Sequence, residues 1–427
     1  MNVTLLSTYD AQGGAAIAAR RLHDALLRQG VASTMLVQEQ RRAHEGVEAV
    51  AKTGWQKGLA FSRFALERAA FFPFEREKSV RWSFSPGVMG TDISRHSLVQ
   101  QADILHLHWV NFGFQSIEDL GKLLALGKPV VWTMHDMWPF TGGCHHSGTC
   151  ERYQEACGNC EPFLRNPAPN DLSHRVWLRK QKAYANARLR PVGCSVWLAN
   201  RARRSRLFGS LPVEAIPNPI DTELFKPLEK ALAKRKFGLS PDKKLILFAA
   251  ANVSAVGKGF MYFEKGLHLL QQQLIDSEGV ELLIFGGGDE TLLENLPFRY
   301  HFLGSLNDVP QISAAYSAAD VFVTPSLEEN LPNTIMEAMA CGTPAIGFDV
   351  GGIPEMITHR QTGYLARYRA ADDLAEGMRW TLEQSPEAYA QLANNARQYV
   401  LANYAGAVVA GRYLSLYESI LNERMNE

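Results

Sequence analysis

Three features of specialised proteins are missing from this 427-residue sequence. No stretch reaches the roughly 18 continuous apolar residues that a membrane-spanning helix needs. The start, Met1–Thr8, has no basic residues and runs into polar Tyr9–Gln12, which argues against a secretion signal. A formal net charge of zero argues against a general nucleic-acid binder. We therefore expect a cytoplasmic protein, either free or peripheral on the inner face of the cytoplasmic membrane.

Internal repeats and low-complexity tracts are also absent, and the composition, 46% hydrophobic and 21% charged, is that of an ordinary globular protein. The length is too great for one hydrophobic core and suits two domains of about 200 residues. Apolar strand-like runs alternate with longer helical patterns, which is typical of parallel sheets covered by helices. The sequence predicts an α/β fold with strands at 2–8, 32–38, 103–107, 129–134 and 191–195, then at 244–250, 280–285, 300–303, 321–324 and 345–348.

Closely spaced prolines in Ile216–Asp221 cannot continue a helix or an inner strand. They mark the linker between two doubly wound domains, the first over residues 1–216 and the second over 222–403. The last stretch, 404–427, has a helical pattern, and we expect it to pack back on the first domain.

The strongest chemical signal is the run 325–344, where a strand is expected to end at Thr324 and a loop leads into a helix. Pro332 suits the first turn of that helix, which is expected to end near Cys341. Backbone amides and the partial positive charge of a helix start form an anion site suited to a diphosphate. The expected contacts of this site with the ligand are Asn330, Leu331, Pro332, Asn333 and Thr334.

Two carboxylates of the same run, Glu329 and Glu337, lie eight positions apart, one before the helix and one within it. They can bind two sets of hydroxyls, Glu329 those of a transferred sugar and Glu337 those of a ribose. A single exposed glutamate is more often only solvated, since charged side chains are mostly exposed. The strand before the run and the Gly-Thr-Pro turn after it favour a binding site here.

This run resembles the hallmark of the family 4 retaining glycosyltransferases: two glutamates with seven residues between them, followed by an Ala-Met-Ala-Cys-Gly-Thr-Pro segment at 338–344. The resemblance extends over almost the whole chain. It implies the GT-B fold, in which two Rossmann-like domains face a central cleft. It also implies transfer of a sugar from a nucleotide diphosphate donor with retained anomeric configuration and with no catalytic metal or cofactor.

Glycine turns at two strand ends fit the same resemblance. Gly13 and Gly14 follow the first strand, where backbone can approach a phosphate or a sugar, although a plain strand-to-helix turn explains them equally well. Gly286 follows a strand of the second domain, and the equivalent loop of the family lies near the nucleotide base.

Two further candidates take their roles from the resemblance. Lys258, in Val-Gly-Lys-Gly at 256–259, matches the family's lysine-glycine element and is expected to neutralise the donor phosphates. The family often has an arginine five residues earlier, but this chain has Val253, so the second cation stays unassigned. His135 follows a strand at the edge where sites of parallel sheets form, and it corresponds to a histidine of the donor-sugar pocket. We name Lys258, Glu329 and His135 as the catalytic set.

Four cysteines lie within 17 residues, namely Cys144, Cys150, Cys157 and Cys160. Four thiolates can enclose a structural zinc ion, and a reducing cytoplasm argues against two disulfides. Disulfides, a redox pair and unligated thiols remain alternatives. If zinc is present, we expect it to organise the loop after His135 rather than to activate water.

An anionic membrane is a further possible partner. The segment 57–78 mixes five phenylalanines with arginines, which is typical of a helix that docks on such a surface, although packing on the first domain explains it equally well. Residues 172–213 contain ten Lys or Arg and no Asp or Glu, which also favours an anionic partner.

The sequence predicts transfer to a glycan or lipid-linked acceptor, in bacterial surface polysaccharide synthesis by family resemblance. A nucleotide-sugar epimerase, a phosphorylase and a non-catalytic nucleotide-sugar binder remain alternatives, because they can share the architecture. A dinucleotide oxidoreductase is disfavoured, since Gly13 and Gly14 form no Gly-x-Gly-x-x-Gly fingerprint.

Overall fold

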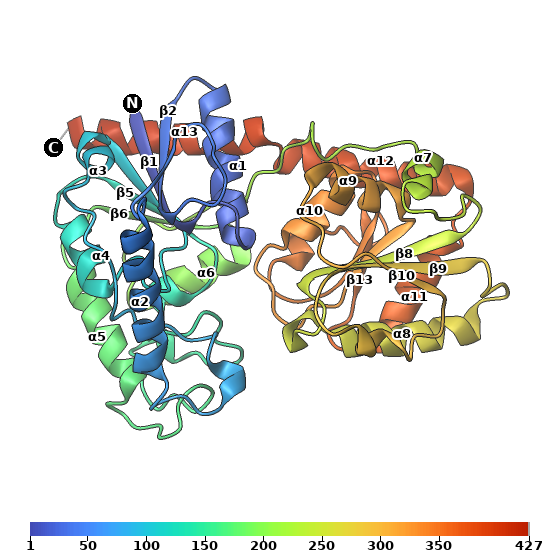
Figure 1. The fold of residues 1–427 in the computed structure, drawn as a ribbon, viewed down its shortest axis with the longest axis horizontal. Coiled ribbons are helices and arrows are strands. Elements are labelled where there is room, and N and C mark those ends of the chain that lie inside the picture. Colours follow the sequence, from blue (N-terminus) through green and yellow to red (C-terminus); the bar gives the residue numbers. More distant parts are fainter. Residues whose placement is uncertain (426–427) are drawn as a thin grey trace. The chain divides into compact units, whose positions relative to one another are not determined.

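The computed structural model describes residues 1–425 and divides into two compact units (Figure 1). Unit 1 contains Met1–Pro219 and the chain from Val409 onward, and unit 2 contains Ile220–Val408. Each unit is a parallel sheet covered by helices, which confirms the predicted pair of Rossmann-like domains. No helix among residues 1–425 is both long and apolar enough to span a bilayer.

The sheet of unit 1 has seven parallel strands in the order β3-β2-β1-β4-β5-β6-β7. The two central strands, β1 and β4, pair with their apolar residues buried on both faces. The chain builds outward from β1 in one direction and from β4 in the other, so the topological switch point lies between them. The strands are β1 (Asn2–Tyr9), β2 (Ala32–Glu39), β3 (Val47–Ala49), β4 (Ile104–Leu107), β5 (Val130–Met134), β6 (Leu189–Gly193) and β7 (Glu214–Ala215).

Helices pack on both faces of this sheet, and each face has its own apolar cluster. One cluster joins the sheet to α4, α5 and α6, and the other joins it to α1 and the final helix α13. The helices of unit 1 are α1 (Gly14–Arg28), α2 (Gly54–Phe71), α3 (Ser97–Gln101), α4 (Ile117–Leu124), α5 (Leu172–Tyr184), α6 (Val196–Arg204) and α13 (Gly406–Met425). Short 3-10 turns lie at Lys78–Val80, Trp138–Phe140 and Arg152–Gln154.

The last helix supplies hydrogen bonds as well as apolar contacts to unit 1. Tyr417 Oη lies 2.6 Å from His106 Nδ1, and Tyr413 Oη lies 2.6 Å from Thr133 Oγ1. All four side chains are buried. The C-terminal segment thus belongs to the core of the unit that begins the chain. Of the stretch 404–427 predicted as a helix, residues 426 and 427 lie outside the described residues.

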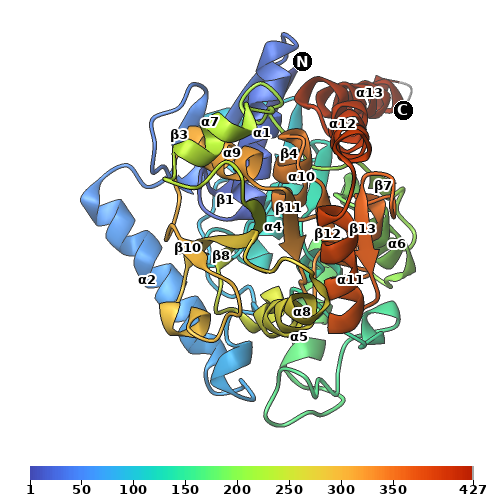
Figure 2. The same cartoon turned by 90° about the vertical axis from the view of Figure 1, so that its right-hand side faces the viewer.

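Unit 2 has a six-stranded parallel sheet in the order β10-β9-β8-β11-β12-β13, with its switch point between β8 and β11. In Figures 1 and 2, α8 and α11 cover one face, and α9 and α10 cover the other. The strands are β8 (Lys244–Asn252), β9 (Val280–Gly287), β10 (Tyr300–Phe302), β11 (Val321–Thr324), β12 (Ala345–Phe348) and β13 (Gly363–Ala366). The helices are α7 (Lys230–Arg235), α8 (Phe260–Gln273), α9 (Val309–Ala318), α10 (Asn333–Ala340), α11 (Ala371–Leu382) and α12 (Pro386–Asn403), with 3-10 turns at Val256–Lys258, Glu290–Leu293 and Ile353–Glu355.

Three strands were not predicted, and all three are outer strands of their sheets. β3 has three residues and β7 has two, too few to show a period in the sequence. β13 begins at Gly363, a residue type that weakens the strand signal. The amphipathic segment predicted at 57–78 is helical only to Phe71, where α2 ends.

Candidate functional site

The candidate residues of unit 2 follow three adjacent strands. Lys258 lies in the turn after β8, Gly286 lies at the end of β9, and Glu329 lies in the loop after β11. Because β8 and β11 flank the switch point, their following loops leave the sheet on opposite sides and make room for a ligand between them. The fold therefore brings together residues that are 71 positions apart in the sequence.

Lys258 and Glu329 form a direct ion pair through Nζ and Oε1. Their side chains are 36% and 15% exposed, so the pair is accessible from solvent without being fully hydrated. Ser326 Oγ also donates to Glu329 Oε1 at 3.3 Å, and the Leu327 amide donates to the Gly257 carbonyl at 2.8 Å. The two loops are thus joined by backbone as well as by charge.

Two glycines fix these loops at close range. A Cβ at Gly259 would lie 1.9 Å from the Pro325 carbonyl oxygen, and one at Gly351 would lie 1.7 Å from the Glu329 carbonyl oxygen. Both have positive φ, 69° and 61°, which side chains disfavour. Gly351 was missed in the sequence, although the Gly-Gly pair at 351–352 after a strand is the kind of signal that marks close backbone approach.

Helix α10 presents its N-terminus beside the Glu329 loop. It begins at Asn333 and ends at Ala340, one residue before the end predicted near Cys341. Pro332 is the N-cap, because its ψ of 117° is extended rather than helical. Asn330, Leu331 and Pro332 are buried, whereas Asn333 and Thr334 are half-buried at the helix start.

Glu337 lies one turn further into α10 and is half-buried. Its Oε2 accepts a hydrogen bond of 3.2 Å from Tyr316 of α9.

Close packing requires a glycine at position 286, since a Cβ there would lie 1.9 Å from the Ala250 carbonyl oxygen. Val253 is fully buried in the core of unit 2, so this position supplies no cation.

The remaining candidates, Gly13, Gly14 and His135, belong to unit 1, where they follow β1 and β5. Gly13 is the N-cap of α1 with φ 85°, and a Cβ there would meet nothing within 4 Å. The backbone at this helix start is therefore open. His135 Nε2 lies 3.0 Å from His108 Nδ1, which follows β4.

Three histidines line up at this edge, with ring centroids 4.4 Å apart for His106 and His108 and 5.3 Å apart for His108 and His135. Burial and the charge of His135 lower the pKa of His106 to about 3, and burial lowers the pKa of His135 to about 4. Burial lowers the pKa of His108 as well. The folded unit therefore holds all three rings neutral at physiological pH.

This cluster predicts acid sensitivity of unit 1. Between pH 6.5 and about 4, the unfolded chain binds protons at these histidines and the folded unit does not, so stability falls as pH falls. The slope is about 1 kcal/mol per pH unit for each histidine. Urea unfolding at pH 7, 6 and 5 should show this loss of stability. In His106→Asn, the slope of the free energy of unfolding against pH should be smaller by the contribution of about one histidine. His268→Asn, on an exposed position of α8, is the control; an unchanged slope in His106→Asn would contradict this account.

Two family models match the chain. Residues 243–384 match glycosyl transferases group 1, and residues 12–224 match glycosyltransferase family 4. The chain belongs to glycosyltransferase family 4.

The curated relatives of this family 4 chain carry the names of enzymes with different substrates. An N-acetyl-alpha-D-glucosaminyl L-malate synthase of Bacillus anthracis is 26% identical over 223 residues, 50% of this chain and 55% of the relative. A D-inositol 3-phosphate glycosyltransferase of Pseudarthrobacter chlorophenolicus is 31% identical over 287 residues, 64% of this chain and 61% of the relative. The chain spans about half the length of these curated relatives.

Solved structures share the fold of the family 4 chain over nearly its whole length. Sucrose-phosphate synthase from Thermosynechococcus elongatus gives a TM-score of 0.67 at 20% identity, covering 99% of both chains. Anabaena HepE, solved in complex with UDP and glucose, gives 0.64 at 15% identity, covering 98% of this chain and 100% of that one.

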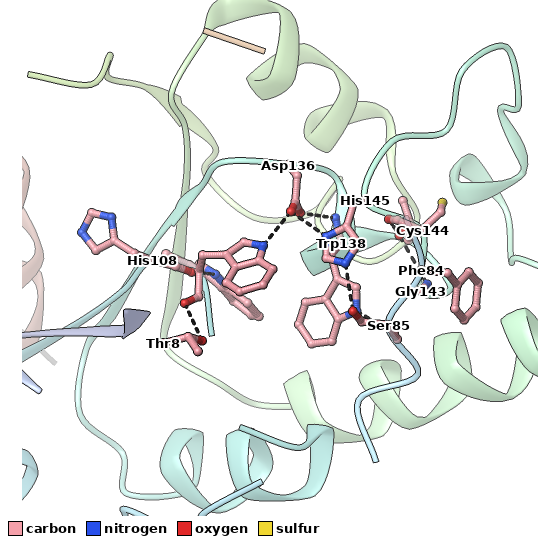
Figure 3. Close-up of polar contacts among 12 residues, drawn as sticks. Thr8, Phe84, Ser85, His108, Asp136, Trp138, Gly143, Cys144 and His145 are labelled. Atoms are coloured by element: carbon pink, nitrogen blue, oxygen red, sulfur yellow. Dashed lines mark hydrogen bonds and ion pairs between the residues drawn. The ribbon is translucent and has the colours of Figure 1, made fainter. Parts of the chain in front are cut away.

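A buried row of side chains in unit 1 has the order of a hydrolase triad (Figure 3). His145 places Nδ1 2.7 Å from Asp136 Oδ2 and Nε2 2.9 Å from Ser85 Oγ. Burial opposes ionisation of Asp136, but the charge and hydrogen bond of His145 outweigh it and lower the Asp136 pKa to about 2. Ser85 is fully buried and its hydroxyl also accepts from Arg68, so it cannot meet a substrate. The row instead connects Asp136, directly after β5, to His145, in the segment 144–160 that carries the four cysteines.

The four cysteines line one small cavity of about 20 Å³, beside Phe84 and Phe163. Burial raises the pKa of Cys157 to about 11 and of Cys160 to about 12, and it raises the pKa of Cys144 well above the ordinary value of a thiol. Among residues 1–425, no three His, Cys, Asp or Glu side chains are already grouped as a metal-binding set. The cavity gathers the thiols without fixing what they bind.

Proposed function

We propose that this chain is a retaining glycosyltransferase that moves a sugar from a nucleotide diphosphate donor to a glycan or lipid-linked acceptor. The observation that carries the proposal is the Lys258–Glu329 pair at the switch point of unit 2, beside the N-terminus of α10. An ammonium and a helix start next to each other suit a diphosphate, and a carboxylate that is only partly buried suits the hydroxyls of a sugar.

In this proposal, the bond between C1 of the sugar and the phosphate oxygen breaks while the acceptor oxygen bonds to C1 on the same face. The acceptor proton passes to the leaving phosphate oxygen, so no side-chain nucleophile is needed. Lys258 and the amides near Asn333 stabilise the charge that grows on the phosphate. Glu329 orients the sugar, Glu337 holds the ribose, and no catalytic metal takes part.

For unit 1 by itself, we propose that His135 binds a sugar hydroxyl and that the open backbone of Gly13 and Gly14 binds a phosphate or a sugar. The name of one relative supports a lipid-linked acceptor: a Campylobacter jejuni protein, 30% identical over 188 residues, that covers 43% of this chain and is an N,N'-diacetylbacillosaminyl-diphospho-undecaprenol alpha-1,3-N-acetylgalactosaminyltransferase. We extend the proposal to bacterial surface polysaccharide synthesis, with the chain in the cytoplasm or on the inner membrane face.

The test is a thermal-shift screen of UDP-, GDP- and ADP-sugars, followed by product analysis with candidate acceptors and NMR of the anomeric configuration. The expected result is stabilisation by one donor class and a product of retained configuration in the presence of a chelator. An epimerase would instead convert the donor alone, without an acceptor. Donor binding without any turnover would favour the non-catalytic alternative. Inversion of configuration would overturn the mechanism, and so would loss of activity on chelation in protein that keeps its melting temperature.

We also propose a structural zinc at Cys144, Cys150, Cys157 and Cys160. Support comes from the shared cavity, from the Gly142 amide that donates to Cys157 Sγ at 3.1 Å, and from the buried ammonium of Lys180, for which Cys144 and Cys157 are electrostatic partners. A zinc tetrathiolate carries a net negative charge that would balance this ammonium. Its role would be to hold the segment that carries His145.

Elemental analysis of the purified chain should give about one zinc per molecule. Cys157→Ser should lose the metal and lower the melting temperature of unit 1, whereas Cys194→Ala, at a buried cysteine outside the cavity, should keep the metal. Metal-free protein with fewer than six titratable thiols would favour the disulfide alternative instead.

A further inference from the structure

A run of aromatic side chains crosses the carboxyl edge of the unit 1 sheet, and the proposed transfer mechanism does not use it. The run starts at Tyr9, the last residue of β1, and passes to Trp109 and Phe112 in the segment after β4. It ends at Phe64 of α2 and at Trp82. Since β1 and β4 flank the switch point of unit 1, the run begins where ligands bind in open parallel sheets.

The rings touch in sequence. Tyr9 stacks on Trp109 with centroids 6.3 Å apart, and Trp109 meets Phe112 edge to face at 4.7 Å. Phe112 lies 6.0 Å from both Phe64 and Trp82, which stack on each other at 6.1 Å. None of the five rings is fully buried, and Trp82 is 55% exposed. The aromatic run thus offers apolar ring surface to solvent along a connected path.

The backbone holds this surface under strain. Phe112 has φ 58°, a conformation that is rare for a bulky residue and costs on the order of 1–3 kcal/mol. The next residue, Gly113, is pressed against α2, because a Cβ there would lie 2.7 Å from the Phe64 amide nitrogen. The Arg68 guanidinium lies 4.5 Å from the Phe112 ring centroid and supports it. Strain retained at a half-buried ring indicates that the position of the ring matters.

Polar atoms without partners lie in the same segment. Among the described residues, His108 Nε2 and Asn111 Nδ2 are buried and have no hydrogen-bond partner, and the two side chains are 3% and 4% exposed. Leaving such groups unpaired costs about 1–3 kcal/mol each, which a ligand hydroxyl or a water brought by it can recover. An acyl chain would leave them unpaired.

We propose that the aromatic run binds a carbohydrate. A sugar ring offers C–H faces that pack on aromatic rings and hydroxyls that pair with polar groups, which matches both features of this edge. The inference rests on the proposed function, in which this carbohydrate is the acceptor, and it assigns the acceptor subsite to Trp109, Phe112 and Trp82.

The test uses the full chain, with UDP present, on a printed glycan array. The variants are Trp82→Ala and Phe112→Gly, the latter because glycine keeps the positive φ while it removes the ring. The control is Trp55→Ala, which removes a side chain as large as Trp82 that is 76% exposed on α2, the helix that carries Phe64, and belongs to no ring pair of the run. Each variant is first checked for an unchanged melting temperature and an unchanged shift on UDP binding.

The expected result is wild-type binding to at least one glycan class, weakened tenfold or more in Trp82→Ala and Phe112→Gly and within twofold of wild type in Trp55→Ala. The inference would be overturned if the wild type bound no glycan. It would also be overturned if Trp82→Ala and Phe112→Gly bound glycans as tightly as the wild type does. Equal losses in Trp55→Ala would also overturn it, because the whole exposed apolar face would then be the contact, as for a lipid surface. A missing UDP shift in the wild type would count against the proposed function alone, since glycan binding is read separately.

Discussion

Lys258→Ala is expected to lower kcat for sugar transfer by about 100- to 1,000-fold, because it removes the charge placed next to the leaving phosphate. This corresponds to about 3–4 kcal/mol in the barrier. Steady-state transfer kinetics with the donor found by thermal shift measure it. The loss should appear mainly in kcat, since the charge on the phosphate grows in the transition state.

The control for this variant is Lys265→Ala, which removes an exposed lysine of α8 in the same unit. Glu329→Gln separates charge from position, since it keeps the size of the side chain but releases Lys258 from its ion pair. We expect this variant to weaken transfer as well. If Lys258→Ala and Glu329→Gln both transferred sugar at the wild-type rate, the assigned site would be wrong even for a true transferase.

Gly351→Ala is expected to lower transfer by about 100-fold while the protein stays folded. The new Cβ would overlap the Glu329 carbonyl oxygen at 1.7 Å, so the loop that carries the carboxylate must move. A displacement of about 1 Å in a reacting group can cost a factor of this size. Kinetics and thermal melting of the purified variant measure both effects.

The matched control is Gly304→Ala. Gly304 has almost the same φ, 62° against 61°, but a Cβ there would meet nothing within 4 Å. Both variants carry a similar backbone strain of about 1 kcal/mol, so only the overlap distinguishes them. Equal activity in the two variants would show that the Glu329 loop does not need its present position.

The central strands and the site loops could be predicted because their signals are local. Buried parallel strands read as continuous apolar runs, and the bounds predicted for 321–324 and 345–348 are those observed. The end of α10 was predicted near Cys341 and lies at Ala340, a difference of one residue that is usual at helix ends. Fine boundaries depend on ψ, which composition does not fix.

Two groupings of distant residues could not be predicted. The three-histidine cluster joins residues from two strand ends, and the aromatic run joins β1, α2 and the segment after β4. His135 was singled out by its place after a strand, but nothing in the sequence pairs it with His106 and His108 or connects the five rings of the run. Only the strand order of unit 1, set by tertiary packing, places them together.

The last helix has a consequence for how this protein is made. Tyr413 and Tyr417 fill the first unit beside His106 and Thr133, yet the ribosome adds them only after the whole of unit 2. The amino-terminal part of unit 1 must therefore wait, with an apolar face uncovered, until unit 2 and α13 have been synthesised. A fragment that stops at the interdomain prolines would keep that face exposed and should aggregate, so separate expression of the first unit calls for a copy of α13 fused to it.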